Sequence, residues 1–453
     1  MRRAFLLKRA LCGLCASVVG FLCAFALAAQ SGSGGVNRAE HLDKPYVVLV
    51  SLDGFRADYL DRFRLPNLAR IMKRGVRAKW MNPVFPTLTF PNHYSLVTGL
   101  HPQKHGIVSN SFYDPVRREK YVMHEDEVVT DGSWYRGEPI WVTAETQGMV
   151  AACYFWPGSE AAIKGVRPTF AMRYDEKVPN RARVRRALEW LQLPPEQRPH
   201  MITLYFSELD TASHRNRLES REIERAAQSL DSAIGSLLNG IDALPVAGQV
   251  NLVITSDHGM VETGRSRTIT VESLVTLSGV EHTFDGAVTS FHIAGRETTR
   301  AAKLRDDLNA RLQHGRAYLR EELPQRFQYR DDPRAGDVIV LMGEPWMLRR
   351  AGLRTLRPGR WGMHGWDPAL PSMRAIFLAM GPRIRAGAVI EPVDNVDVYP
   401  FMSELLGLRP AEGIDGRTGQ ISEMVRVPHP PVAPHTPVAS GFSRKLPISP
   451  HAR

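Results

Sequence analysis

The chain has 453 residues, of which 43% are hydrophobic and 23% are charged. This composition excludes a collagen, a coiled coil and a wholly disordered protein, because it supplies enough apolar side chains for a large core. The formal net charge of +11 is compatible with an anionic substrate but does not require one.

The first 29 residues have the pattern of a signal peptide. A basic start is followed by an apolar run from Ala10 to Ala29, which contains the small-residue cleavage pattern Ala26-Leu27-Ala28. An uncleaved membrane anchor is the alternative, since about 20 apolar residues can span a bilayer. We therefore predict a signal peptide over 1–29, a linker over 30–42 and a periplasmic or secreted protein with no stable membrane span once the peptide is cleaved. Cys153 is the only cysteine outside this segment, so the mature chain is not expected to form an internal disulfide.

The region 43–426 alternates apolar runs of strand length with amphipathic helical patterns. Helices are predicted over Arg183–Leu191 and Arg221–Leu238. This alternation is typical of an α/β fold with a mostly parallel central sheet and helices on both faces. The predicted strands are Tyr46–Leu52, Met149–Phe155, Met201–Phe206, Leu252–Thr255 and Ala375–Ala379.

Two regions depart from this alternation. Residues 261–360 have a less regular pattern with one amphipathic helix near Thr299–Leu312, which predicts an inserted cap subdomain. Residues 427–453 are rich in proline and have little to bury, so we predict a disordered tail.

Acids and histidines follow three of the predicted strands directly. The carboxyl ends of parallel strands share one edge of a sheet, where ligands bind. Carboxylates and imidazoles together favour a divalent ion such as zinc. Taken singly, each residue has an ordinary alternative as a helix cap or a polar surface group, but their joint occurrence after three strands favours a metal site. The residues are Asp53 after the first strand, Asp210 and His214 after the third, and Asp257 and His258 after the fourth.

The segment from Pro86 to Gly99 places a threonine hydroxyl just before a helix that we expect to begin near Pro91. A helix start offers unpaired N–H groups and a positive dipole end, which suit a phosphate. A metal ion would activate the hydroxyl as a nucleophile. The alternative is that Thr87 or Thr89 only caps the helix.

These segments together resemble the nucleotide pyrophosphatase/phosphodiesterases of the alkaline phosphatase superfamily, in their bacterial single-domain form. The resemblance extends from Val47-Val48-Leu49-Val50-Ser51-Leu52-Asp53-Gly54-Phe55-Arg56 to Gly362-Met363-His364-Gly365-Trp366-Asp367. Pro86 to Gly99 and His105-Gly106-Ile107 are its most diagnostic parts. It implies an alkaline-phosphatase-like catalytic domain over 43–426.

The resemblance also implies roles for individual residues. Thr89 becomes the nucleophile, Thr87 becomes structural, and Asn110 donates to a phosphate oxygen. Two zinc ions about 4 Å apart would serve an in-line displacement through a phosphothreonine intermediate. The implied ligands are Asp53, Thr89, Asp257 and His258 for one zinc ion, and Asp210, His214 and His364 for the other.

Aromatic residues suggest the substrate. By resemblance, Phe90 and Tyr174 would stack on a nucleobase, and stacking contributes about 1–3 kcal/mol per base. Tyr205 is a third candidate, for which plain packing in a buried strand is an equal alternative. One loop departs from the family pattern but keeps the Asp to His spacing, namely Glu208-Leu209-Asp210-Thr211-Ala212-Ser213-His214. The metal assignment is therefore unchanged, and the departure bears on the preference for the leaving group.

We therefore expect an exported two-zinc hydrolase. It would cleave nucleotide phosphodiester and pyrophosphate bonds to nucleoside 5′-monophosphates, with no specific binding of a nucleic-acid duplex. One alternative is a phosphodiesterase acting on phospholipid head groups or glycerophosphodiesters. The other is a non-catalytic protein that binds metal or nucleotide.

Overall fold

The computed structural model describes residues 34–352, 358–422 and 424. The predicted signal peptide and the predicted tail over 427–453 lie outside the described residues. Within them, no helix combines the length and apolarity needed to cross a bilayer.

The linker predicted over 30–42 differs from the structure in its second half. Asn37 is buried, and its side-chain amide donates to the Pro195 and Arg198 carbonyls at 2.9 and 2.8 Å while its Oδ1 accepts from the Val150 N–H at 2.7 Å. One asparagine therefore ties this segment to two loops of the main body, an effect that a Gly/Ser-rich composition does not reveal.

An eight-stranded sheet forms the centre of the molecule, in the order β19-β2-β18-β9-β1-β8-β6-β7. β1 runs parallel to both of its neighbours, with Ser51 opposite Tyr205 in β8 and opposite Thr255 in β9. All five predicted strands belong to this sheet, but β18 is antiparallel to β9 and β2, so the sheet is mixed at one side. The strands are β1 (Tyr46–Leu52), β2 (Val76–Ala78), β6 (Ala151–Tyr154), β7 (Phe170–Met172), β8 (Met201–Phe206), β9 (Val250–Thr255), β18 (Phe377–Met380) and β19 (Ala388–Ile390).

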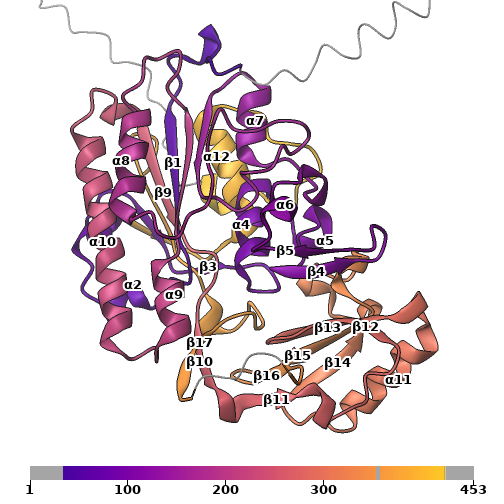
Figure 1. Ribbon diagram of the computed structural model, residues 1–453. Helices are drawn as coiled ribbons and strands as arrows, with labels where there is room; N and C mark the ends of the chain where they lie inside the picture. The colour runs from indigo at the N-terminus through magenta and orange to yellow at the C-terminus, as the bar shows by residue number, and fades with distance from the viewer. Residues whose placement is uncertain (1–33, 353–357, 423, 425–453) are drawn as a thin grey trace, which may run out of the picture.

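Helices cover both faces of this sheet, as the fully buried central strands require (Figure 1). Alternate residues of β1 enter opposite cores: Val48 and Val50 pack on one face, and Val47 and Leu49 on the other. The first face is covered by α2 (Tyr59–Arg62), α3 (Pro66–Arg74), α8 (Asn180–Trp190) and α10 (Arg221–Asp242), and the second by α4 (Thr89–Thr98), α7 (Ile140–Thr146) and α12 (Val398–Leu406).

Short elements complete this body. They are the hairpin β4 (Ser111–Asp114) and β5 (Glu119–Val122), the pair β3 (Met81–Asn82) and β20 (Val393–Asp394), and the helices α5 (Pro102–His105), α6 (Asp126–Val129), α9 (Glu208–Arg215) and α13 (Gly419–Ser422).

Most of the 261–360 region forms a separate lobe around an antiparallel sheet of order β12-β13-β15-β14 (Figure 1). The lobe has its own core, to which α11 contributes Leu304 and Leu308. Its strands and helix are β12 (Val280–Phe284), β13 (Val288–Ile293), β14 (Gly315–Leu319), β15 (Val338–Met342) and α11 (Thr298–Asn309), with β11 (Thr268–Thr270) paired to β16 (Met347–Arg349).

An antiparallel ribbon of β10 (Val261–Gly264) and β17 (Arg360–Met363) connects the lobe to the central sheet. β10 begins three residues after His258, and β17 ends immediately before His364. The ribbon therefore returns the chain to the edge of the sheet from which it left.

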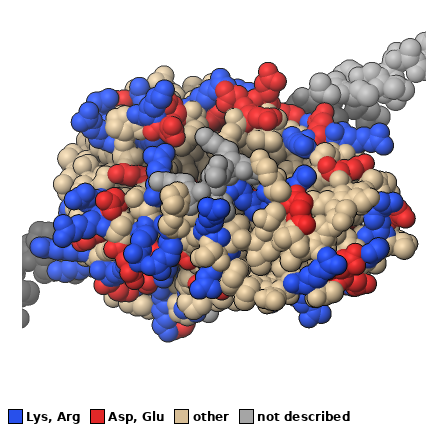
Figure 2. All heavy atoms as spheres, turned by 60° about the horizontal axis from the view of Figure 1, so that its bottom comes forward, with Lys and Arg blue, Asp and Glu red and all other residues tan. Residues whose placement is uncertain are grey.

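Charged side chains of both signs are interspersed over the face shown in Figure 2, and Lys and Arg do not form a single continuous patch there. On this face, the net charge of the chain is therefore not concentrated into one basic stripe.

Candidate metal centre and nucleophile

The carboxyl ends of three adjacent strands bring the predicted acids together. Asp53 follows β1, Asp257 follows β9, and α9, which carries Asp210, begins two residues after β8 ends. Because β1 pairs in parallel with both β8 and β9, these three ends lie side by side. With His214 on α9 and His258 after Asp257, five ligand candidates thus lie at one edge. The most distant pair in sequence, Asp53 and His258, is 205 positions apart.

A tight turn after Asp53 positions a second carboxylate. Gly54 has φ +69°, a conformation that L side chains rarely adopt, and its N–H donates to Asp257 Oδ1 at 3.0 Å. The same oxygen accepts from the His258 N–H at 2.9 Å. These two backbone donors hold one oxygen of Asp257 and leave Oδ2 facing the other acids and imidazoles.

Three histidines are oriented in the same way. In each ring Nδ1 contacts a backbone carbonyl at 2.9 Å, which leaves Nε2 with its lone pair directed at the carboxylates. This arrangement is typical of metal-binding histidines, because the second nitrogen fixes the tautomer and the ring plane. The pairs are His214 with the Gly362 carbonyl, His258 with that of Gly259 and His364 with that of Thr87.

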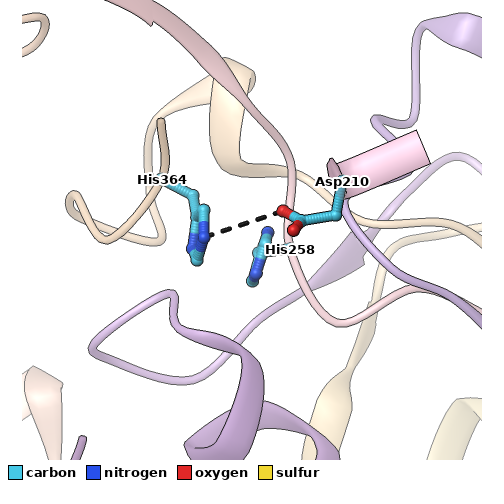
Figure 3. Close-up of side chains that lie close together, drawn as sticks. All are labelled: Asp210, His258 and His364. Carbon is cyan, nitrogen blue, oxygen red and sulfur yellow. Dashed lines mark ion pairs between the residues drawn. The ribbon is translucent and has the colours of Figure 1, made fainter. Parts of the chain in front are cut away.

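The Nε2 atoms converge on the carboxylates. Asp210 Oδ1 lies 3.3 Å from His214 Nε2. It also lies 3.7 Å from His364 Nε2, as Figure 3 shows. His258 Nε2 lies 3.0 Å from Asp257 Oδ2 and 3.6 Å from Asp53 Oδ1. The His258 and His364 rings are stacked with centroids 3.7 Å apart, so the two sets form one continuous cluster.

The cluster has the donor chemistry of a site for divalent cations. Asp53 Oδ1, Asp210 Oδ1 and Asp257 Oδ2 are buried and have no hydrogen-bond partner. A buried unpaired carboxylate oxygen is costly unless a cation or a proton neutralises it. Three such oxygens among three imidazole Nε2 atoms fit metal ions with nitrogen and oxygen ligands, and zinc is the usual ion for such a set.

The electrostatics indicate the same need for positive charge. Burial, reinforced by the carboxylates of Asp257 and Asp210, raises the pKa of Asp53 well above its usual range. Burial also raises the pKa of Asp257, but the imidazoles of His258 and His93 outweigh it and hold that pKa below its usual range. The imidazoles alone therefore do not balance the negative charge of the three carboxylates, and bound cations would supply the missing positive charge.

Thr89 is the first residue of α4, two residues earlier than the predicted helix start. The helix accommodates Pro91 in its first turn, where a missing N–H costs nothing. The buried Thr89 Oγ1 lies 3.4 Å from His258 Nε2, within the metal cluster. The structure therefore brings the predicted nucleophile and the predicted metal ligands together.

Asn110 is joined to the residue after Thr89. Its Oδ1 accepts from the Phe90 N–H at 2.8 Å, which leaves Nδ2 as the amide group that can donate to a ligand. This contact changes one expectation, because the Phe90 N–H at the helix start is paired to Asn110 and is no longer a free phosphate donor.

Sequence reasoning assigned no role to His93, which lies one helical turn after Thr89. Its Nδ1 contacts the Thr89 carbonyl at 2.9 Å and its Nε2 contacts Ser51 Oγ at 2.8 Å. His93 also falls in a possible metal-binding group with Asp53 and Asp257. Since both ring nitrogens already have partners, we interpret His93 as the link that holds the start of α4 against β1. The i, i+4 spacing from Thr89 was the only sequence signal for it.

The three aromatic candidates occupy different environments. Tyr174 is 46% exposed, and its ring lies 5.3 Å from Phe155 and 6.2 Å from Tyr205. Phe90 is half-buried with its ring 6.1 Å from Tyr121. Tyr205 is only 8% exposed, and its hydroxyl donates to Asp53 Oδ2 at 2.5 Å. Tyr174 and Phe90 thus offer ring surface to a ligand, whereas Tyr205 is connected to the metal cluster.

A cleft of about 890 Å³ lies between α8, α9 and α10. Thr211 and Arg215 line it, whereas Asp210 and His214 of the same helix contribute to the metal cluster. With 3.6 residues per turn these pairs occupy different faces of α9, so the helix separates the cleft from the cluster.

A mixed, mostly parallel sheet whose strand ends collect carboxylates and imidazoles beside a threonine at a helix start defines an α/β protein of the alkaline phosphatase type. A model of the family described as type I phosphodiesterase / nucleotide pyrophosphatase matches residues 47–367. The chain belongs to this family.

Relatives and solved structures agree with this assignment. The chain is 35% identical over 422 residues to ectonucleotide pyrophosphatase/phosphodiesterase family member 3 of Mus musculus, covering 90% of this chain and 48% of that protein. It is 34% identical over 414 residues to venom phosphodiesterase CdcPDE of Crotalus durissus collilineatus, covering 88% and 48%. The chain thus spans about half the length of the curated relatives it matches.

The structure superimposes on murine ectonucleotide pyrophosphatase/phosphodiesterase 5, in a threonine-to-alanine variant described as inactive and bound to AMP. The TM-score is 0.79 at 28% identity, covering 85% of this chain and all of the other. The human form of that protein gives the same TM-score at 29% identity.

Proposed function

We propose that this protein is an exported hydrolase that cleaves nucleotide phosphodiester and pyrophosphate bonds to nucleoside 5′-monophosphates, with Thr89 as nucleophile and two zinc ions as cofactors. The observation that carries the proposal is the position of Thr89 Oγ1, at the start of α4 and 3.4 Å from His258 Nε2, inside a cluster of unpaired buried carboxylates. The inactive threonine-to-alanine variant of a structural neighbour supports a threonine in this role.

In this proposal the ligands divide between two metal sites. Asp53, Asp257, His258 and Thr89 would hold one zinc ion, and Asp210, His214 and His364 the other. When bound, such ions supply Lewis acidity: they lower the pKa of a hydroxyl or a water and neutralise charge on phosphoryl oxygens. The central position of His258 Nε2, which is close to both Asp257 and Asp53, supports its place in the first set.

The chain's own groups perform the displacement. Thr89 Oγ1 loses its proton and forms a bond to phosphorus as the bond to the leaving oxygen breaks on the opposite side. The leaving oxygen takes up a proton, which gives the first product and a phosphothreonine that still carries the nucleoside. A water molecule then forms a new bond to phosphorus, the bond to Oγ1 breaks, and Oγ1 regains a proton as the monophosphate leaves. Asn110 Nδ2 donates to a non-bridging oxygen, and the neutral amide suits a diester with a single negative charge.

A nucleotide is the substrate that the exposed aromatics favour. The accessible ring of Tyr174 and the half-buried ring of Phe90 offer stacking surfaces on which any base could lie. AMP in the neighbour's structure supports the same substrate class. No specific observation favours a phospholipid substrate or a protein that binds without turnover.

Export is part of the proposal. It rests on the apolar segment after a basic start, with small residues at the expected cleavage position. Mass spectrometry of the protein from the periplasm or medium should show a new N-terminus near residue 29. Full-length protein in the membrane would contradict cleavage, and protein found only in the cytoplasm would contradict export.

Product analysis of the purified protein tests the activity. With ATP and with p-nitrophenyl thymidine monophosphate we expect nucleoside 5′-monophosphates, and with p-nitrophenyl phosphorylcholine we expect much lower turnover. Thr89→Ala should abolish cleavage while zinc content stays nearly stoichiometric, and Thr89→Ser should retain measurable turnover because it keeps the hydroxyl. Equal activity of Thr89→Ala and the wild type would remove Thr89 as nucleophile.

A further inference from the structure

Tyr205 is a buried tyrosine whose hydroxyl does not face solvent or a backbone group. It lies on β8, directly opposite Ser51 of β1, and so beside the strand that Asp53 follows. Its hydroxyl donates to Asp53 Oδ2 at 2.5 Å. The ring packs edge-on against His93 at 5.1 Å, which fixes the phenol plane from the side of α4.

Because of this contact, the two carboxylate oxygens of Asp53 have different environments. Oδ2 is occupied by the phenol, whereas Oδ1 has no hydrogen-bond partner and lies 3.6 Å from His258 Nε2. Asp257 shows the same division, since Oδ1 accepts two backbone N–H groups and Oδ2 has no hydrogen-bond partner. In both acids a protein donor holds one oxygen, and the oxygen without a hydrogen-bond partner is the one left for a cation.

The two acids differ in what supplies the donor. Backbone groups of Gly54 and His258 hold Asp257, and a side-chain substitution does not remove them. Asp53 depends on a side chain, so Tyr205 is the point at which this arrangement can be tested. Hydrogen bonds to the distal atom of a metal ligand fix its orientation and change its affinity for the metal.

Tyr174 is the more accessible of two neighbouring tyrosines. The two rings are 6.2 Å apart, and Tyr174 is 46% exposed where Tyr205 is 8% exposed. A base that stacks on Tyr174 therefore meets that ring first, and the Tyr205 hydroxyl is already engaged by Asp53.

We propose that Tyr205 is a positioning residue for the metal centre: its phenol holds Asp53 so that the acid binds a zinc ion through Oδ1 alone, and it does not select the nucleobase. The inference rests on the proposed two-zinc site. The sequence left Tyr205 open between substrate contact and plain packing, and this inference gives it a third role, in ligand orientation.

Tyr205→Phe in the full chain tests this proposal, because it removes one oxygen atom and keeps the ring. Zinc affinity is measured without substrate, by competition with a chromophoric chelator. We expect about 10- to 100-fold weaker binding of one of the two zinc ions, the usual effect of losing such a partner. At saturating zinc, kcat for p-nitrophenyl thymidine monophosphate should fall while KM changes little. Unchanged zinc affinity, or a change in KM that depends on the base, would overturn the proposal.

Tyr399→Phe is the matched control. Tyr399 is also buried, and its hydroxyl is bonded to Thr143 Oγ1 and to the Ala411 N–H at 2.8 Å each, on α12 and away from the metal cluster. This variant should bind zinc like the wild type. In an Asp53→Asn background, Tyr205→Phe should add little further loss of zinc affinity, since the phenol acts through the carboxylate. Additive losses would contradict an action through Asp53.

A spectroscopic measurement covers the case in which Tyr205→Phe does not fold. The full chain is prepared with 3-fluorotyrosine at position 205 or at position 399. The ¹⁹F resonance at 205 should shift when zinc is added to the metal-free protein, and that at 399 should not. No shift at 205 would refute the proposal. Because neither zinc binding nor the ¹⁹F signal needs a substrate, these results stand apart from the nucleotide assay, whose failure would refute only the proposed substrate.

Discussion

Gly54→Ala should disturb both the fold and the metal centre. At φ +69° an alanine has a backbone cost of about 1–2 kcal/mol. Its Cβ would also lie 3.2 Å from the Asp210 Cα and 3.1 Å from Met260 Cε. The methionine end can move, but the Asp210 backbone belongs to α9, and overpacking of this kind costs about 1–3 kcal/mol. We therefore expect a total destabilisation of about 2–5 kcal/mol.

Gly165→Ala separates the two contributions. Gly165 has φ +78°, but a Cβ there would meet nothing within 4 Å, so this variant has the backbone cost alone. Urea unfolding of both variants measures the difference, and chelator competition measures zinc affinity. Gly54→Ala should be the less stable of the two and should bind zinc more weakly, because its methyl group displaces Asp210. Equal destabilisation of the two variants with unchanged zinc affinity would refute the steric argument.

Three further predictions concern buried contacts and the metal. Thr87 Oγ1 donates to the Trp366 carbonyl at 2.9 Å and accepts from the Gly365 N–H at 3.0 Å, so Thr87→Val should cost about 1–3 kcal/mol per unpaired group in urea unfolding, and Thr87→Ser should recover most of it. Burial raises the pKa of Asp114, but backbone N–H groups and Arg334 outweigh it and hold that pKa below its usual value. The ionised carboxylate therefore stabilises the fold above its unfolded-state pKa of about 4, and this stabilisation is lost as pH falls through the lower folded-state pKa. In Asp114→Asn the free energy of unfolding should depend less steeply on pH in that range. A slope equal to that of the wild type would contradict this prediction. Removal of zinc by a chelator should lower the free energy of unfolding by about 4 kcal/mol if free zinc is 1,000 times its dissociation constant, and an unchanged calorimetric melting temperature would contradict a bound ion.

The sequence predicted the central sheet well because its strands are nearly continuous apolar runs. Tyr46–Leu52 and Met201–Phe206 match β1 and β8 residue for residue. Such runs identify strands buried on both faces, and the acids that follow them predict a shared edge. The direction of β18 could not be inferred in this way, since an apolar run carries no information on whether its neighbours are parallel.

The candidate ligands were of two kinds. Asp53, Asp210 and Asp257 follow predicted strands, so the strand pattern alone placed them near one another. His364 follows β17, a short strand that returns from the inserted lobe, and only the family resemblance pointed to it. Its position depends on the pairing of β17 with β10, a contact between residues about 100 positions apart, as in the Val261–Met363 pair.

The sequence by itself determined the elements and the chemical character of this protein, because apolar periodicity and the positions of acids and histidines are local properties of the chain. Tertiary structure alone decided how those groups are oriented. It paired the Phe90 N–H with Asn110, engaged both nitrogens of His93 and directed the Tyr205 hydroxyl to Asp53. These contacts join residues as far as 152 positions apart, and their geometry depends on strand register and helix packing, which no single segment encodes.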